Sequence, residues 1–213
     1  MGNGRPTTPS KSEISRLFSA VRMGAHDHIA SLLESGMSVN QPNTLDGGTP
    51  LMAAVYHQHS ETVAFLLSRG ASLLNVDLDG NTALHLMAAQ RSEHYDTRTA
   101  YLLVSAGAPL EVINDMGNTP LLAVARAACL YDLCKADYGM ETDVSTVLEA
   151  LIDLGANVLA VGKDNKTARE LIASNLSHCH PKKGPEMLGI LDRKIIEQQT
   201  KSCASHHRIR RSL

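Results

Sequence analysis

The chain has no tryptophan and only two phenylalanines among its 213 residues, and aromatic residues make up 3% of it. A fold built around large aromatic side chains is therefore excluded. Hydrophobic residues still reach 43%, so a core must be formed by leucine, alanine, valine and isoleucine. These side chains suit thin helices that stack closely, because each unit of such a stack buries its apolar face only on its neighbours.

Long apolar runs are also missing. No stretch approaches the roughly 20 apolar residues that a membrane-spanning helix needs, and the chain does not start with the pattern of a secretory signal. The four cysteines, Cys129, Cys134, Cys179 and Cys203, lack the spacing of a disulfide framework. We therefore expect free thiols in a reducing compartment. This favours a protein of the cytoplasm, with the nucleus as the alternative, that does not engage a membrane.

Sequence motifs of catalysis are absent as well. The chain has no G-x-S-x-G elbow, no G-x-x-x-x-G-K loop and no G-x-G-x-x-G run after a strand, which are the patterns that expose a nucleophile or cradle a phosphate. We therefore expect no catalytic residue, no cofactor and no small-molecule substrate. The aspartates that precede several threonines recur at a regular spacing, so we interpret them as turn formers rather than as catalytic carboxylates.

One pattern occurs four times along the chain. Each copy starts with an aspartate-led turn in which glycine or asparagine precedes threonine, and a short run that is mostly apolar follows. Glycine and asparagine tolerate the left-handed backbone of such a turn, threonine caps the following helix, and proline suits the first helical position. The copies lie at residues 46–54, 79–88, 115–123 and 164–171.

A second helix is predicted to end each unit. An apolar run stops at a glycine, which is the residue that most often ends a helix in the left-handed conformation. These glycines are Gly36, Gly70, Gly107 and Gly155. Turns followed by two helices, with a T-P-L-H-x-A-type signature, resemble the ankyrin repeat, a unit of about 33 residues. In the position of the signature histidine the chain has Met52, His85, Leu122 and Glu170.

The resemblance covers residues 12 to 173 and implies an all-α ankyrin-repeat solenoid of about five helix-pair units, with β-turn tips and a C-terminal helical cap. Thr49 and Thr82 are 33 positions apart, but Thr82 to Thr119 spans 37 and Thr119 to Thr167 spans 48. Two units therefore carry insertions. We expect units at 12–44, 45–77, 78–114, 115–163 with the insertion 127–142, and 164–173 as the start of the cap.

The two ends of the chain differ from this body. Residues 1–11 are rich in Gly, Pro, Ser and Thr, so we expect a disordered lead-in. A capping helix is expected within 174–197, and 198–213 is expected to be a disordered basic tail. From Ser174 onward the chain has eight Lys/Arg against three Asp/Glu, whereas the preceding part has twelve against nineteen. An acidic body repels phosphates, which argues against nucleic acid as its ligand.

The resemblance also implies where a partner would bind. Family members use the concave face of the first helices and the turn tips, and insertions often add to the binding face. The expected contacts on the helices are Arg22, Met23, Tyr56, His57, Gln90 and Arg126. Those at the tips are Leu45, Leu78, Asn81, Met116 and Asn118, and those in the insertion are Tyr131 and Tyr138.

The sequence thus favours a non-catalytic protein–protein interaction module, acting as an adaptor, scaffold or steric inhibitor and monomeric on its own. Two alternatives stay open. The first is a small metal-dependent protein or enzyme that uses the Cys/His-rich C-terminal segment, although consecutive His and Cys residues do not have the usual paired spacing of a zinc site. Its residues are His178, Cys179, His180, Cys203, His206 and His207. The second is docking of the basic tail on an acidic partner or nucleic acid.

Overall fold

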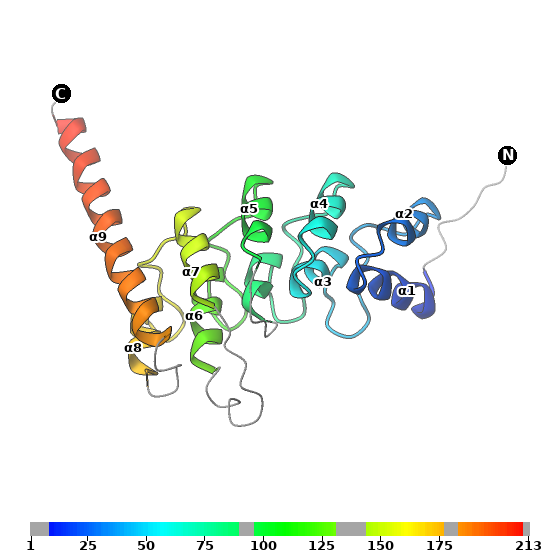
Figure 1. Ribbon diagram of the computed structural model, residues 1–213, viewed down its shortest axis with the longest axis horizontal. Coiled ribbons are helices and arrows are strands. Elements are labelled where there is room, and N and C mark those ends of the chain that lie inside the picture. Colours follow the sequence, from blue (N-terminus) through cyan, green and yellow to red (C-terminus); the bar gives the residue numbers. More distant parts are fainter. Residues whose placement is uncertain (1–8, 90–95, 131–143, 177–182, 211–213) are drawn as a thin grey trace.

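The computed structural model describes residues 9–89, 96–130, 144–176 and 183–210, with the side chains of 88, 129, 130, 183 and 201–210 left aside. Helices follow one another in pairs, and no β-strand occurs in these ranges. The pairs are α1 (Lys11–Arg22) with α2 (His26–Glu34), α3 (Pro50–Tyr56) with α4 (Ser60–Ser68), η1 (Ala83–Ala88) with α5 (Arg98–Ser105), α6 (Pro120–Leu130) with α7 (Val144–Asp153), and α8 (Ala168–Ser174) with α9 (Lys183–Arg210). The predicted all-α helical solenoid is confirmed (Figure 1).

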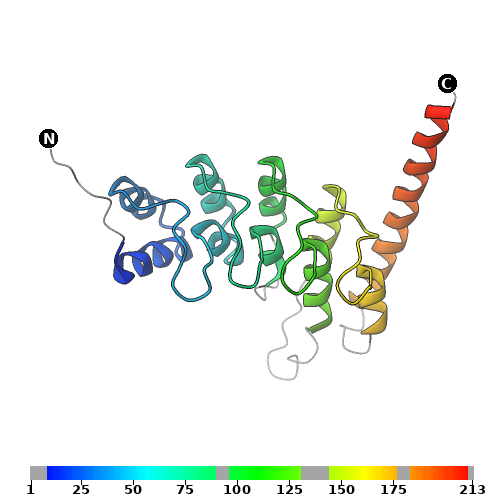
Figure 2. The same ribbon diagram turned by 180° about the vertical axis from the view of Figure 1, so that it is seen from behind.

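The helices form two rows (Figures 1 and 2). The first helices α1, α3, η1, α6 and α8 contact one another in sequence. The second row starts with α2 and continues with α4, α5, α7 and α9, of which the last four contact one another in sequence. Leu51, Leu84 and Leu121 follow their threonines by two residues and are at most 1% exposed. Each therefore fills the space between neighbouring first helices. The expectation that leucine and other aliphatic residues form the core is met in the described residues.

The turns are joined to one another through their backbones. The N–H of Leu78 donates to the carbonyl of Asp46 (2.8 Å), the N–H of Asp115 to that of Asp79 (3.0 Å), and the N–H of Lys163 to that of Gly117 (3.2 Å). Gly47, Gly80 and Gly117 have positive φ, and Asn165 has φ 56° at the equivalent place. The turn chemistry read from the sequence therefore produces one continuous ladder along the solenoid.

The caps of the first helices follow the predicted threonines. The Thr167 hydroxyl accepts from the Glu170 N–H (3.3 Å), and the Glu170 carboxylate accepts from the Thr167 N–H (2.8 Å). Glu170 thus takes the role that His85 has in the third unit, where the ring nitrogen accepts from the Thr82 N–H (3.1 Å). The third unit differs in one respect, because its first helix, η1, is a 3₁₀ helix.

The two ends of the helical body differ from expectation. Helix α1 starts at Lys11, within the segment predicted to be disordered, because the Ser10 hydroxyl and the Glu13 carboxylate form a reciprocal cap. At the other end, α9 continues to Arg210, so the predicted disorder from Gln198 onward is wrong as far as Arg210. Residues 198–210 contain neither proline nor glycine, so a helix that is already formed extends through them without a break.

Candidate functional site

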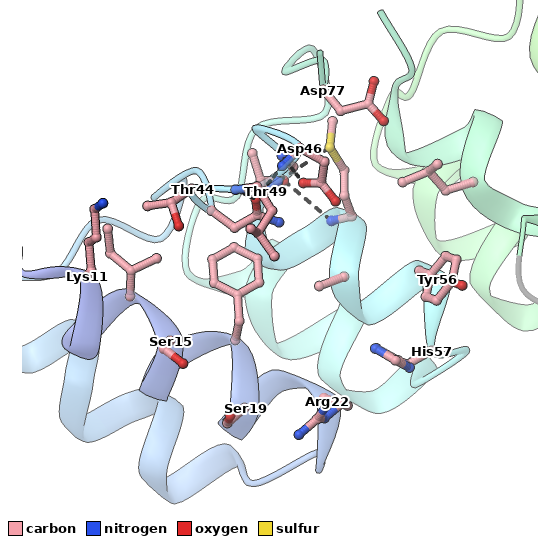
Figure 3. A pocket seen from close by; sticks show the side chains of 18 residues that line it. Lys11, Ser15, Ser19, Arg22, Thr44, Asp46, Thr49, Tyr56, His57 and Asp77 are labelled. Atoms are coloured by element: carbon pink, nitrogen blue, oxygen red, sulfur yellow. Dashed lines mark hydrogen bonds between the residues drawn. The ribbon is translucent and has the colours of Figure 1, made fainter. Parts of the chain in front are cut away.

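A groove of about 660 Å³ lies on the row of first helices near the start of the chain (Figure 3). Residues of helix α1, of the turn at 43–48 and of helix α3 line it, together with Leu86 of η1. We call this the N-terminal groove. Its lining is more apolar than polar and includes the side chains of Phe18, Leu45, Met52 and Tyr56.

Four of the predicted partner contacts meet at this groove, namely Arg22, Leu45, Tyr56 and His57. Leu45 is 89% exposed and Tyr56 is 40% exposed. The rings of Tyr56 and His57 meet edge to face, with 5.2 Å between their centroids. Large side chains from three elements therefore border one apolar depression, which is an arrangement typical of interaction sites rather than of a solvated helix face.

A hydrogen bond from the next loop holds the end of α1 in place. The His59 Nε2–H donates to the carbonyl of Arg22 (2.8 Å), and the His59 and His57 rings stack with centroids 6.2 Å apart. Burial, followed by the charges of His59 and Arg22, lowers the pKa of His57. At neutral pH the His57 ring therefore contributes a neutral, polar aromatic surface beside the cationic Arg22.

A second, smaller depression of about 350 Å³ lies in the fourth unit and brings together Met116, Asn118 and Arg126. The Arg126 guanidinium donates to Asp164 (2.7 Å) and to the side-chain oxygen of Asn118 (2.7 Å). Arg126 is thus engaged within the chain, where it links the fourth and fifth units. Met116 is 60% exposed and remains accessible.

Asn118 does not fit its predicted role as a tip contact. It is 1% exposed, because the adjacent turns pack around it. Its N–H donates to the side chain of Asn114 (2.9 Å) and its carbonyl accepts from His85 (2.9 Å). Asn118 therefore supports the turn from inside and cannot touch a partner directly.

Of the remaining predicted contacts, those that the structure describes do not line the groove. Met23 and Leu78 are 75% and 74% exposed. Asn81 is tied into the turns, since its amide donates to Asp77 (3.1 Å) and accepts from Asn114 (2.7 Å). Gln90, Tyr131 and Tyr138 lie outside the described residues.

Two residues that line the groove were not predicted as contacts from the sequence. Lys11 falls within the predicted disordered lead-in, and no partner contact is predicted at Phe18, whereas both residues line the groove. Their spacing with Ser15 and Arg22 carries a signal, because residues 11, 15, 18 and 22 lie on one face of a helix. That signal becomes visible only once α1 is known to start at Lys11.

The C-terminal metal hypothesis concerns residues outside the described part of the chain. Residues 178–180 are not described, nor are the side chains of Cys203, His206 and His207. Among the side chains that are described, no three His, Cys, Asp or Glu residues group as metal ligands would. In the same ranges, no helix combines the length and the apolar character needed to cross a bilayer.

Comparisons with known proteins agree with this architecture. The family model "Ankyrin repeats (3 copies)" matches residues 6–77, and "Ankyrin repeat" matches residues 79–115, together just over half of the chain.

Among curated relatives, phosphocholine transferase AnkX of Legionella pneumophila is 26% identical over 140 residues, which are 66% of this chain and 14% of that protein. Putative ankyrin repeat protein FPV031 of fowlpox virus is 31% identical over 134 residues, 62% of this chain and 38% of that protein. The chain spans well under two thirds of either relative, and the match to the transferase is confined to a small part of that enzyme. With the repeated turns, paired helices and family matches in agreement, the chain belongs to the ankyrin-repeat family.

Proposed function

We propose that this chain is a non-catalytic module that holds a protein partner in the N-terminal groove and acts as an adaptor, scaffold or steric inhibitor. Ankyrin repeats are protein–protein interaction modules, and the relatives it matches include a further ankyrin-repeat protein. The observation that carries the proposal is the meeting of Arg22, Leu45, Tyr56 and His57 around one apolar depression.

The residue types support this site. Tyrosine and arginine are over-represented among the residues that dominate binding energy at interfaces, especially where they border a desolvated pocket. Leu45 leaves most of its surface in water, and covering an exposed leucine side chain contributes about 1.5–3 kcal/mol. Leu45 and Tyr56 are therefore the side chains whose removal should weaken binding most.

A matched pair of double variants tests the proposal. The groove variant Leu45→Ser/Tyr56→Ala is compared with the control Leu74→Ser/Tyr101→Ala, since Leu74 and Tyr101 are 72% and 46% exposed and do not line the groove. Each protein is used to capture partners quantitatively from a lysate of the source organism. We expect the partner to be retained by the intact chain and the control and lost from the groove variant. Equal capture by both variants, with both folded, would contradict the site.

The fourth-unit insertion is a second part of the same proposal. The described part of α6 reaches Leu130 and that of α7 starts at Val144, so a short Gly-Ser linker in place of residues 131–143 keeps both helices as far as the structure describes them. This segment includes Tyr131 and Tyr138. Reduced capture of the same partner is expected if the insertion adds contacts. Unchanged capture would remove the insertion from the binding site.

Helix α9 favours one further candidate, docking of the basic C-terminal part on an acidic partner. The helix extends beyond the two rows (Figures 1 and 2), and its sequence includes Arg193, Lys194, Lys201, Arg208 and Arg210. Lys194 is already paired with Asp153 (2.7 Å), so this surface depends mainly on the last turns. Truncation after Thr200 tests it, because partner capture that survives the truncation and depends little on salt would exclude this mode.

A further inference from the structure

One face of α1 forms a straight wall of the N-terminal groove. Lys11, Ser15, Phe18 and Arg22 follow one another at helical spacing and all line the groove. With a rise of 1.5 Å per residue, the eleven steps from Lys11 to Arg22 span about 16 Å. Figure 3 shows the two basic side chains at opposite ends of this wall, with Ser15 and Ser19 between them.

The charges of the groove are not equally available. Asp46 accepts from the Gly48 N–H (2.8 Å), and Asp77 accepts from the Asp79 N–H (3.0 Å), the Asn81 N–H (2.8 Å) and the Asn81 amide (3.1 Å). Both carboxylates therefore accept hydrogen bonds from their own turns. Within the described part of the chain, by contrast, the side chains of Lys11 and Arg22 form no ion pair and no hydrogen bond.

The space between the two cations is apolar and can be approached closely. Phe18 is half-buried, Met52 is 2% exposed and Leu45 is 89% exposed, and all three side chains line the groove. Ser15 and Ser19 are small, so a ligand backbone can come near α1 at these positions. An apolar ligand side chain placed over Phe18 would lie between the two positive charges.

We infer that the N-terminal groove selects a segment of a protein partner in which two carboxylates, about 16 Å apart, flank a large apolar residue. This inference rests on the proposed function and adds the chemistry of the partner. The separation corresponds to about eleven residues of a helix or about five of an extended strand. Lys11 and Arg22 bind the carboxylates, and Phe18, Leu45 and Tyr56 hold the apolar residue.

The test starts from a library of random 16-residue peptides displayed on phage and selected on the full-length chain. Enriched peptides are synthesised, and their affinities are measured by fluorescence polarisation at low and at near-physiological salt. We expect a large apolar residue with an acidic residue on each side, and binding that weakens as salt rises because exposed charges are screened. Replacing either acidic residue of the peptide by its amide should weaken binding.

Two charge variants then assign the carboxylates to their partners. Lys11→Gln/Arg22→Gln should weaken binding about tenfold, the effect expected of two exposed ion pairs. In this variant the amide peptides should bind no more weakly than the acidic ones. The control Arg16→Gln/Arg98→Gln removes two exposed basic residues that do not line the groove, and it should bind within about twofold of the intact chain.

The outcomes separate this inference from the proposed function. The charge rule is the requirement for two carboxylates in the partner. It would be overturned, with the groove kept as the site, by peptides that no longer bind the Leu45→Ser/Tyr56→Ala variant but lack acidic residues. Peptides that no longer bind that variant but bind Lys11→Gln/Arg22→Gln as tightly as the intact chain would have the same meaning. Peptides that bind Leu45→Ser/Tyr56→Ala as tightly as the intact chain would overturn both the charge rule and the proposed function. A selection that enriches no peptide would do the same. An equal loss in the Arg16/Arg98 control would also overturn the charge rule, since a general field effect would then explain the result.

Discussion

At the scale of single residues, His85 has the most defined structural role. It is 4% exposed, its Nδ1 accepts from the Thr82 N–H (3.1 Å), and its Nε2–H donates to the carbonyl of Asn118 (2.9 Å). The bond to Asn118 crosses from the third unit to the fourth. His85 therefore fixes both the cap of its own helix and the spacing to the next turn.

His85→Ala should lower the free energy of unfolding by about 2–4 kcal/mol, because it leaves the buried Thr82 N–H without its acceptor and creates a cavity. Urea denaturation followed by circular dichroism measures this loss. His57→Ala provides the comparison, since His57 is only half-buried, and it should cost less than about 1 kcal/mol. Equal losses at the two positions would contradict the role assigned to His85.

The stability difference between the intact chain and His85→Ala should depend on pH. Burial is the main cause that lowers the pKa of His85, so the unfolded chain binds a proton at this ring more readily than the folded chain. The stabilisation is therefore complete above the unfolded pKa of about 6.5 and is lost as the pH falls toward the folded pKa. The difference should shrink between about pH 7.5 and about pH 5.5. A difference that grows on acidification would contradict the buried neutral ring.

Gly117 is constrained by its neighbour as well as by its backbone. A Cβ on Gly117, whose φ is +76°, would lie 2.4 Å from the Cβ and 3.0 Å from the N of Lys163, whereas a Cβ on Gly70, whose φ is +83°, meets nothing within 4 Å. Gly70→Ala should cost about 1–2 kcal/mol from backbone strain alone. Gly117→Ala should cost about 2 kcal/mol more, because the turn ladder must separate. Similar unfolding midpoints for the two variants would exclude this contact.

At the scale of elements, the first half of α9 closes the stack. Met187, Ile190 and Leu191 are at most 5% exposed against the preceding helices. Arg169 pairs with Asp192, and Lys194 pairs with Asp153, but exposed ion pairs contribute at most about 1 kcal/mol each. The burial of apolar side chains therefore does most to hold α9 in place.

Two truncations test this division of α9. Ending the chain after Asn175 exposes the surface that Met187, Ile190 and Leu191 cover, which should lower the free energy of unfolding by about 5 kcal/mol. The urea midpoint of this truncated chain should therefore fall sharply. Ending the chain after Thr200 should leave the midpoint unchanged and lower only the helical ellipticity. Loss of stability on the shorter deletion would mean that the last turns of α9 also pack on the body.

Local chemistry determined which elements could be predicted. The threonine caps and turn glycines act within a few residues of themselves, so the units and their order could be predicted from the sequence alone. The lengths of α1 and α9 could not, since the Ser10–Glu13 cap and the unbroken run to Arg210 lie in segments whose composition indicates disorder. The 3₁₀ form of η1 was not indicated by the sequence either.

At the scale of the whole molecule, the candidate site depends on contacts between units. Arg22, Leu45, Tyr56 and His57 could be named from the register of the repeats, but the N-terminal groove that joins them needs α1 beside α3. Asn118 was misassigned for the same reason, because its burial arises only when neighbouring turns stack. A repeat pattern therefore predicts well which place a residue takes within its unit, and it predicts less well how exposed the side chain of that residue is.

The proposed function depends on the N-terminal groove holding the partner. Hydrogen–deuterium exchange of the chain alone, and with the partner recovered in the capture experiment, shows which segments the partner covers. We predict slower exchange on binding in residues 11–22 and 43–57, with no change in α9. Protection confined to the fourth unit or to α9, with residues 11–22 and 43–57 exchanging as in the free chain, would contradict binding in the N-terminal groove.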